Sequence, residues 1–150
     1  VYIHIRIYFM LKITRLADYS ILIICCFNKN SRVKLTAPKI SKLTGLSLHT
    51  VNKILAKLVK GKILNTYRGV SGGYVASKEL DDISINDIIE IVEGPVAITD
   101  CISDHSKKCN LIDICGTKKA LSYVNNAIIK TLQDIKIKDI DLKTSHLNRL

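Results

Sequence analysis

The chain has 150 residues, of which 47% are apolar, with five Cys, no Trp, and 23 Lys and Arg against 13 Asp and Glu. This composition excludes a disordered chain, a collagen-like repeat and a disulfide-dense miniprotein. The net charge of +10 favours an anionic partner. Residues 1–78 carry 14 Lys and Arg and one acid, Asp18, whereas residues 79–150 carry nine Lys and Arg and twelve acids. The positive field therefore belongs to the first half of the chain.

Residues 1–9 are expected to be an N-terminal extension that precedes the natural start at Met10. They lack the apolar stretch and small-residue cleavage site of a secretion signal. No segment approaches the roughly 18 apolar residues that a membrane span needs. Together with the odd cysteine count, this predicts a cytoplasmic protein without a membrane partner, in which clustered thiols are more often metal ligands than disulfides.

The first half of the chain predicts three helices. Apolar residues at helical spacing indicate one helix over residues 13–27. Thr36 can cap a second helix over residues 37–44, and Ser47 can cap a third that ends at Gly61. Two short helices joined by so tight a turn form a helix-turn-helix. The expected core face of the third helix is Val51, Ile54, Leu55 and Leu58.

The elements that follow complete a winged helix. Alternating residues over 63–77, around the glycine-rich stretch 68–74, predict two strands joined by a loop. Ser84 opens, in a capping-box pattern, a helix that ends at Glu93, and helical spacing returns over residues 118–136. The expected fold class is mainly α with a small β-wing: a winged helix-turn-helix followed by a long C-terminal dimerisation helix.

Several residues of this winged helix are candidates for contact with double-stranded DNA. The second helix of the motif enters the major groove, where its exposed N-terminal side chains meet base edges and later lysines meet phosphate. Arg68 at the tip of the wing suits a narrow minor groove. A solvated charged face, or an ordinary exposed histidine at position 49, is the alternative, but it explains less well why 14 bases accompany one acid across these elements. The helix candidates are His49, Thr50, Asn52, Lys53, Lys57 and Lys60.

A cluster of cysteines lies in the loop over residues 99–116. Cys101, Cys109 and Cys115 can wrap an iron-sulfur cluster, because soft thiolates suit iron clusters and zinc. The chain has no Cys-x-x-Cys pair of the kind typical of zinc knuckles. Three ligands leave one position for a weaker, replaceable group, which suits a sensor. The alternative is three surface thiols with incidental zinc, whereas Cys25 and Cys26 are expected to be small buried hydrophobes.

Residues 12–19, the helix-turn-helix, the wing over residues 67–74 and the three-cysteine loop together resemble the Rrf-two (Rrf2) family of bacterial iron-sulfur transcription regulators. The resemblance runs over residues 10–140. It implies a homodimer on a palindromic operator and a 2Fe-2S or 4Fe-4S cluster held by the cysteine-loop thiols. It also implies DNA contacts by the wing arginine and the start of the recognition helix, with Asn52 in place of an acidic base reader. Residues 94–101 are similar to the branch that regulates Suf-type cluster assembly genes.

The fourth cluster ligand differs among members of this family. Some place a histidine three residues after the third cysteine, where this chain has Lys118. Others use an aspartate early in the first helix, supplied by the other subunit, and Asp18 is the matching residue. The resemblance therefore implies Asp18, with His105 as an alternative nearer in sequence. The structural alternative for Asp18 is a helix N-terminal charge or a partner of Arg15.

The expected domains are an N-terminal extension (1–9), a winged helix-turn-helix DNA-binding domain (10–80), a cluster-binding loop with dimerisation helix (81–142) and a tail (143–150). The expected function is a DNA-binding transcription regulator, a repressor, gated by an iron-sulfur cluster that responds to iron status or to oxidative or nitrosative stress. The rivals are a constitutive or zinc/thiol-redox DNA-binding protein without a cluster, and a cluster carrier, for which a basic helix-turn-helix has no use. Neither an enzyme nor a small-molecule substrate is expected, because the sequence lacks phosphate-loop, paired-carboxylate and Cys/His nucleophile patterns.

Overall fold

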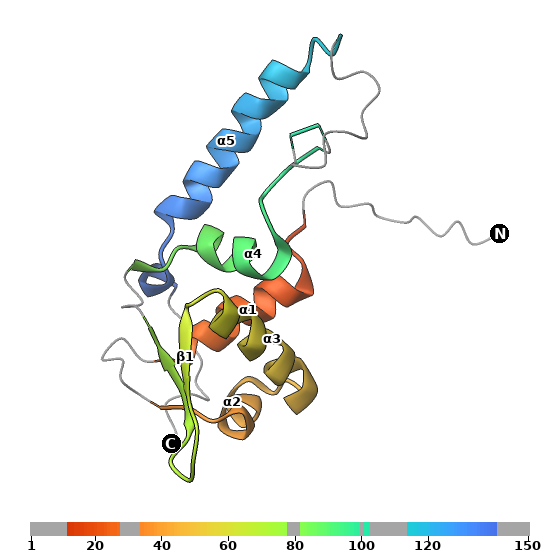
Figure 1. The fold of residues 1–150 in the computed structure, drawn as a ribbon. Helices are drawn as coiled ribbons and strands as arrows, with labels where there is room; N and C mark the ends of the chain where they lie inside the picture. The colour runs from red at the N-terminus through yellow and green to blue at the C-terminus, as the bar shows by residue number, and fades with distance from the viewer. Residues whose placement is uncertain (1–11, 28–33, 78–81, 100, 103–113, 141–150) are drawn as a thin grey trace, which may run out of the picture.

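The computed structural model describes residues 12–27, 34–77, 82–99, 101–102 and 114–140. The expected extension over residues 1–9, Met10, the tail over residues 143–150, and His105 and Cys109 lie outside the described residues. None of the helices in the described ranges combines the length and apolar character needed to cross a membrane. In chain order the elements are α1 (Arg15–Cys25), α2 (Ala37–Thr44), α3 (Leu48–Lys60), β1 (Leu64–Tyr67), β2 (Gly73–Ala76), α4 (Ile85–Glu93), α5 (Lys118–Asp134) and the 3₁₀ helix η3 (Ile137–Asp139) (Figure 1).

Side-chain caps set the starts of the helices in the winged helix-turn-helix. Thr36 accepts a hydrogen bond from the backbone N–H of Lys39 at the start of α2, and Ser47 accepts one from Thr50 at the start of α3. Gly45 ends α2 in a left-handed conformation with φ of 72°. These starts agree with the bounds predicted from the sequence, because capping depends on residues that are close together in the chain.

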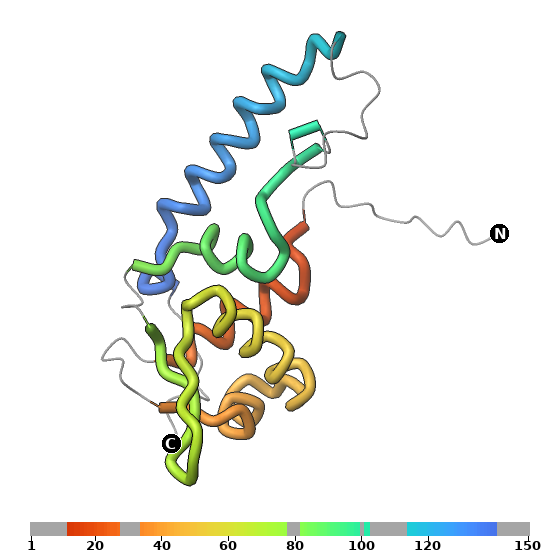
Figure 2. Tube along the Cα trace, viewed as in Figure 1, coloured from red at the N-terminus to blue at the C-terminus, as the bar shows by residue number. Residues whose placement is uncertain are grey.

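The core of the winged helix forms where α1, α2 and α3 meet (Figure 2). The predicted face of α3 is confirmed: Val51, Ile54, Leu55 and Leu58 are all fully buried. Helix α4 joins the same core through Ile85, Ile88 and Val92. The winged-helix core therefore extends into α4, which lies beyond the sequence-based boundary at residues 80 and 81.

The wing is a two-stranded antiparallel sheet with a short third element beside it. Strands β1 and β2 pair from Leu64 with Ala76 to Tyr67 with Gly73. Leu35 forms a bridge to Tyr74 on the outer edge of β2, with N–O distances of 3.0 and 2.8 Å. Gly73 has a φ of 151°, and a Cβ there would lie 2.9 Å from the Leu35 carbonyl oxygen. This position therefore requires glycine for the strands to approach so closely.

Helix α5 extends away from the winged helix, as Figure 1 shows. The C-terminal end of α5, here called its foot, is hydrogen-bonded to the start of α4. The backbone N–H of Ile85 donates to the Ile135 carbonyl at 3.0 Å, and that of Ile137 donates to the Ile83 carbonyl at 2.9 Å. Asn125 is its one buried residue. The fold class expected from the sequence is thus confirmed as a mainly helical winged helix with a small two-stranded sheet and a long late helix.

Candidate nucleic-acid interface and cysteine site

The N-terminal turn of α3 presents the side chains that the sequence marks for base contact. His49, Asn52 and Lys53 are exposed, whereas Thr50 is half-buried. The Thr50 hydroxyl lies 2.9 Å from the Ser47 hydroxyl, so it takes part in the helix cap. His49, Asn52 and Lys53 therefore present the exposed polar side chains of this turn, which suit base edges in a major groove.

Sequence reasoning missed one apolar residue at the same turn. Leu48, the first residue of α3, is 44% exposed beside the exposed polar side chains. An apolar side chain at this position suits the methyl group of a thymine. The signal was present in the sequence as an apolar residue outside the core-facing spacing of α3.

The lysines farther along α3 differ in their surroundings. Lys60 is exposed, as phosphate contact requires. Lys57 is half-buried, and its Nζ donates to the backbone oxygen of Val92 in α4 at 2.7 Å. The structure thus directs the Lys57 ammonium toward the C-terminal end of α4 rather than outward beside Lys60.

The wing has an exposed tip, and Lys34 contacts its loop. Arg68 is exposed, Tyr67 is 51% exposed and Val70 is fully exposed. The ammonium of Lys34 donates to the Ser71 carbonyl at 2.8 Å and lies 5.2 Å from the centre of the Tyr67 ring. Sequence reasoning missed Lys34 as a residue of this interface, because only the bridge between Leu35 and Tyr74 brings it to the wing.

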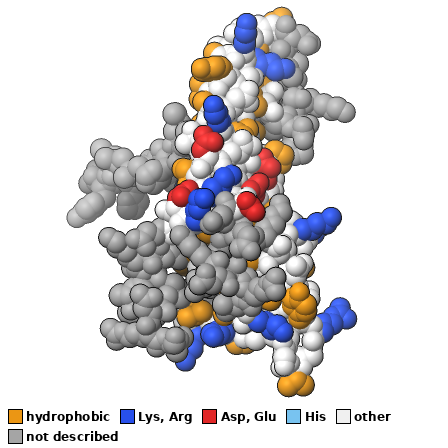
Figure 3. Space-filling view, turned by 90° about the vertical axis from the view of Figure 1, so that its left-hand side faces the viewer, with side chains coloured by type: hydrophobic (Ala, Val, Ile, Leu, Met, Phe, Trp, Pro, Cys, Tyr) orange, Lys and Arg blue, Asp and Glu red, His pale blue; other side chains and the backbone are white. Residues whose placement is uncertain are grey.

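Charged side chains are unevenly spread over the face drawn in Figure 3. Acidic side chains gather at the middle of this face. Its lower end, where Figure 1 places the wing and α2, displays Lys and Arg side chains without acids among the residues described. On this face, Lys and Arg side chains also lie at the upper end, along α5. The lower end, around the wing and α2, therefore offers positive charge to phosphate but is not the only basic part of this face.

The described thiols fall into two classes. Cys25 and Cys26, at the C-terminal end of α1, pack against the core but are half-buried rather than fully buried as expected. Their burial raises the pKa of each to about 11. Cys115 is partly exposed, and its Sγ lies 3.3 Å from the Thr117 hydroxyl. This side-chain hydrogen bond is the main cause that lowers the pKa of Cys115. Half-buried Cys101 has a similar neighbour, with Thr99 Oγ1 3.2 Å from its Sγ.

The ligand set expected for a cluster is therefore described only in part. Cys101 and Cys115 flank residues 103–113, which contain Cys109 and His105 and lie outside the described residues. No three His, Cys, Asp or Glu side chains gather as a metal site among the residues that the structure describes. Asp18 is exposed in the first turn of α1, where a carboxylate also complements the positive end of the helix dipole.

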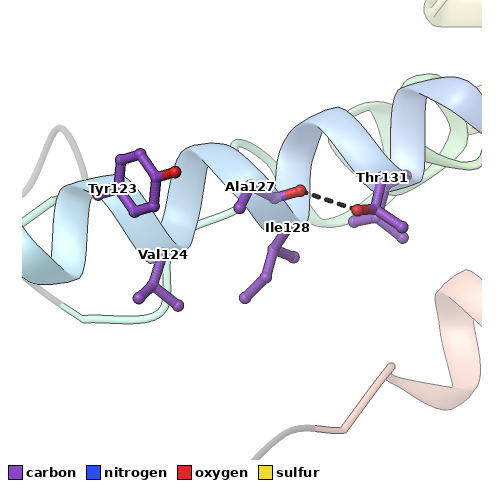
Figure 4. A pocket seen from close by; sticks show the side chains of 6 residues that line it. Tyr123, Val124, Ala127, Ile128 and Thr131 are labelled. Carbon is purple, nitrogen blue, oxygen red and sulfur yellow. Dashed lines mark hydrogen bonds between the residues drawn. The ribbon is translucent and has the colours of Figure 1, made fainter.

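Helix α5 carries an apolar surface that no described residue covers. Tyr123 and Val124 are 78% and 46% exposed, and Val124 and Ile128 project from the same side of the helix in Figure 4. These side chains border a shallow hollow that is almost wholly apolar. The hollow is lined by Tyr123, Val124, Ala127, Ile128, Thr131 and Leu132.

The sequence of the chain is similar to those of known transcription regulators. The sequence profile of the Rrf2 family, described as "Iron-dependent Transcriptional regulator", matches residues 13–141. The HTH-type transcriptional regulator NsrR of Bacillus licheniformis is 27% identical over 141 residues. These residues cover 93% of this chain and 99% of that protein.

Two solved structures share the fold. CymR, the global cysteine regulator of B. subtilis, superposes with a TM-score of 0.66 at 23% identity, over 86% of this chain and 95% of that chain. IscR of T. potens gives a TM-score of 0.63 at 24% identity, over 86% and 85% of the two chains. At these identities the structural likeness supports the winged-helix architecture, and the family profile carries the assignment.

Proposed function

This chain belongs to the Rrf2 family, and we propose that it is a homodimeric repressor whose DNA binding is gated by an iron-sulfur cluster. The family and its named relatives show that this chain is a DNA-binding transcription regulator and not an enzyme. The proposed cluster ligands are Cys101, Cys109 and Cys115, with Asp18 of the other subunit as the fourth. The proposed targets are genes for iron-sulfur cluster assembly.

The observation that carries the cluster proposal is the contrast between the two classes of thiol. A thiol binds iron as the thiolate, so a lowered pKa and solvent access favour ligation. Cys115 has both properties, whereas burial raises the pKa of Cys25 and Cys26 to about 11. The described donors therefore fit a cluster in the cysteine loop and disfavour one in α1.

A bound cluster would supply a cross-link among the cysteine positions that iron shortage, oxygen or nitric oxide removes. The protein's own contribution is to hold both ends of the cysteine loop. The segment before Cys101 is hydrogen-bonded to Asn125, and Cys115 lies three residues before the first residue of α5. A change in the loop would then alter the position of α5 and the spacing of two recognition helices.

The exposed apolar face of α5 supports the proposed homodimer. On this helix of 17 residues, Tyr123 and Val124 stay exposed, and they border the same hollow as half-buried Ile128 and Leu132. A second copy of the same face would bury these side chains around a two-fold axis. A dimer also places two recognition helices on a palindromic operator, whose half-sites lie about one helical turn apart.

The test is to purify the protein without oxygen and to measure visible absorption with iron, sulfide and zinc content. We expect a coloured protein with iron and acid-labile sulfide that oxygen or nitric oxide bleaches. Cys109→Ala should abolish the colour and the response, while the matched control Cys25→Ala should keep both. Unchanged iron and sulfide in Cys109→Ala would overturn the ligand assignment, and Asp18→Ala tests the fourth ligand in the same way.

A thiol-redox regulator without iron is the second candidate, and the lowered pKa of Cys115 is the observation that favours it. At pH 8 a thiol with a pKa of about 11 is about one part in a thousand thiolate. Iodoacetamide should therefore modify Cys115 well before Cys25 in the iron-free protein, as mass spectrometry of peptides can measure. A colourless protein that forms a reversible disulfide in the cysteine loop would favour this candidate over the cluster.

A further inference from the structure

Residues 92–98, here called the linking segment, join the last turn of α4 to the stretch that leads to Cys101. Helix α4 lies between α5 on one side and α1 and α3 on the other (Figure 1). Side chains from α3, from α5 and from Thr14, the residue that caps α1, form hydrogen bonds with this one short segment. The linking segment is therefore the place where the recognition helix, the first helix and the long C-terminal helix meet.

Lys57 makes the bond from the recognition helix. Its ammonium donates to the Val92 carbonyl at 2.7 Å, and Val92 itself is only 3% exposed. The last turn of α4 contains no basic residue of its own, so Lys57 provides the positive charge that complements the free carbonyls at a helix C-terminus. The bond thus ties the last turn of α3 to the end of α4.

Asn125 makes the bond from α5, and it is 2% exposed. Its Oδ1 accepts from the backbone N–H of Ile98 at 3.0 Å, and its Nδ2 donates to the Val96 carbonyl at 3.1 Å. The Asn125 side-chain amide thus pairs with one backbone N–H and one backbone carbonyl, as the backbone of a neighbouring strand would. Thr14 makes a third bond, donating from its hydroxyl to Glu93 at 2.6 Å.

We propose that the linking segment sets the position of the recognition helix, and that Lys57 and Asn125 are the positioning residues that fasten it at its two ends. Lys57 then acts on DNA through α4 rather than through a phosphate contact of its own. Asn125 acts on the same helix from α5, across the segment that precedes Cys101. This inference rests on DNA binding alone and stands whether or not a cluster is bound.

Salt dependence separates the two roles of a lysine. A lysine that neutralises a phosphate releases a counterion, so its removal lowers the slope of log affinity against log salt by about 0.9 and weakens binding to all sequences alike. A lysine that positions the helix changes no counterion count. Its removal should weaken binding to a preferred sequence and leave binding to an arbitrary sequence unchanged.

The probes are two labelled duplexes, one selected from a random library by the wild-type protein and one of mixed sequence. Lys57→Met should lower affinity for the selected duplex by about tenfold, with the wild-type salt slope and unchanged affinity for the mixed duplex. Lys57→Arg should restore the affinity, because its guanidinium can also donate to Val92. The matched control Lys60→Met, at an exposed position of the same helix that suits phosphate contact, should weaken both duplexes and reduce the slope.

Asn125→Ala should repeat the Lys57→Met pattern although it lies on a different helix. The double variant should lose little more than either single variant, because both remove one end of the same connection. Thermal unfolding of each variant identifies a loss that comes from unfolding. A reduced slope in Lys57→Met, unchanged affinity for the selected duplex, or additive losses in the double variant would each overturn the proposal.

Discussion

Helices α3 and α5 are both amphipathic, yet their apolar faces differ in how far they are buried. Helix α3 has 13 residues and buries four apolar side chains completely. Helix α5 has 17 residues and buries one side chain, the polar Asn125, while Tyr123 stays 78% exposed. The difference shows that apolar spacing predicts a helix and its apolar face. It does not predict whether the residues that pack against that face belong to the same chain.

The largest effect should come from a cavity in the α3 core. Ile54→Ala removes fully buried methyl groups and should lower the free energy of unfolding by about 2–5 kcal/mol. Urea unfolding followed by circular dichroism measures this change. The control Asn126→Ala, at an exposed position of α5, should stay within about 0.5 kcal/mol of wild type. Equal losses in the two variants would contradict the contrast between the helices.

A charge on the exposed face of α5 should change assembly rather than folding. Val124→Asp places a carboxylate where the proposed partner copy packs, so the mass from sedimentation equilibrium should fall by half while helical content is kept. Asn126→Asp, outside the hollow lined by Val124, should remain dimeric. DNA affinity should fall by about a hundredfold in the monomer, because two linked half-site contacts become one. A Val124→Asp variant that stays dimeric would place the interface elsewhere.

The tip of the wing should contribute less to DNA binding than the dimer does. Arg68→Ala should weaken binding by about 1–3 kcal/mol, because one exposed guanidinium leaves the groove. Fluorescence polarisation with an A·T-rich duplex measures the loss. Lys62→Ala removes an exposed charge just before the base of the wing and is the matched comparison. A larger loss from Lys62 than from Arg68 would argue against minor-groove insertion by the tip.

The smallest expected effect is the loss of stability on removal of a helix cap, and it should differ between α2 and α5. Thr36→Ala removes the cap of α2 and should cost about 1 kcal/mol of stability. Thr117 at the start of α5 makes no capping hydrogen bond, and its hydroxyl lies beside Cys115 instead. Thr117→Ala should therefore leave the unfolding midpoint unchanged and raise the pKa of Cys115, which alkylation rates at several pH values can follow.

The sequence predicted the helix starts and the core face of α3 because these depend on neighbours along the chain. Ser47 and Thr50 are three residues apart, and the capping box of Ser84 and Asp87 has the same spacing. The exposed recognition side chains follow from that face by exclusion. Sequence reasoning also marked Asp18 and the cysteine loop, whose roles as ligands stay predictions.

The contacts that sequence reasoning missed join residues far apart in the chain. Lys57 lies 35 residues from Val92, and Lys34 lies 37 residues from Ser71. A lysine that donates to a distant carbonyl has the same local pattern as a lysine that faces solvent. Only the packing of α4 against α3, and of Leu35 against β2, decides which role each ammonium takes.

Helix α5 is hydrogen-bonded to the rest of the described chain at two places, so it can move as a lever. Its foot is held beside Ile83 and Ile85, and Asn125 holds it near its middle. At 1.5 Å per residue, 17 residues extend about 25 Å, so a tilt of about 5° at the foot would move the far end by about 2 Å. In the proposed dimer, whose two copies would pair through their α5 helices, the tilts of the two copies would add. In that proposed dimer, a small rotation at one buried asparagine would change the spacing of the two recognition helices relative to the pitch of the double helix.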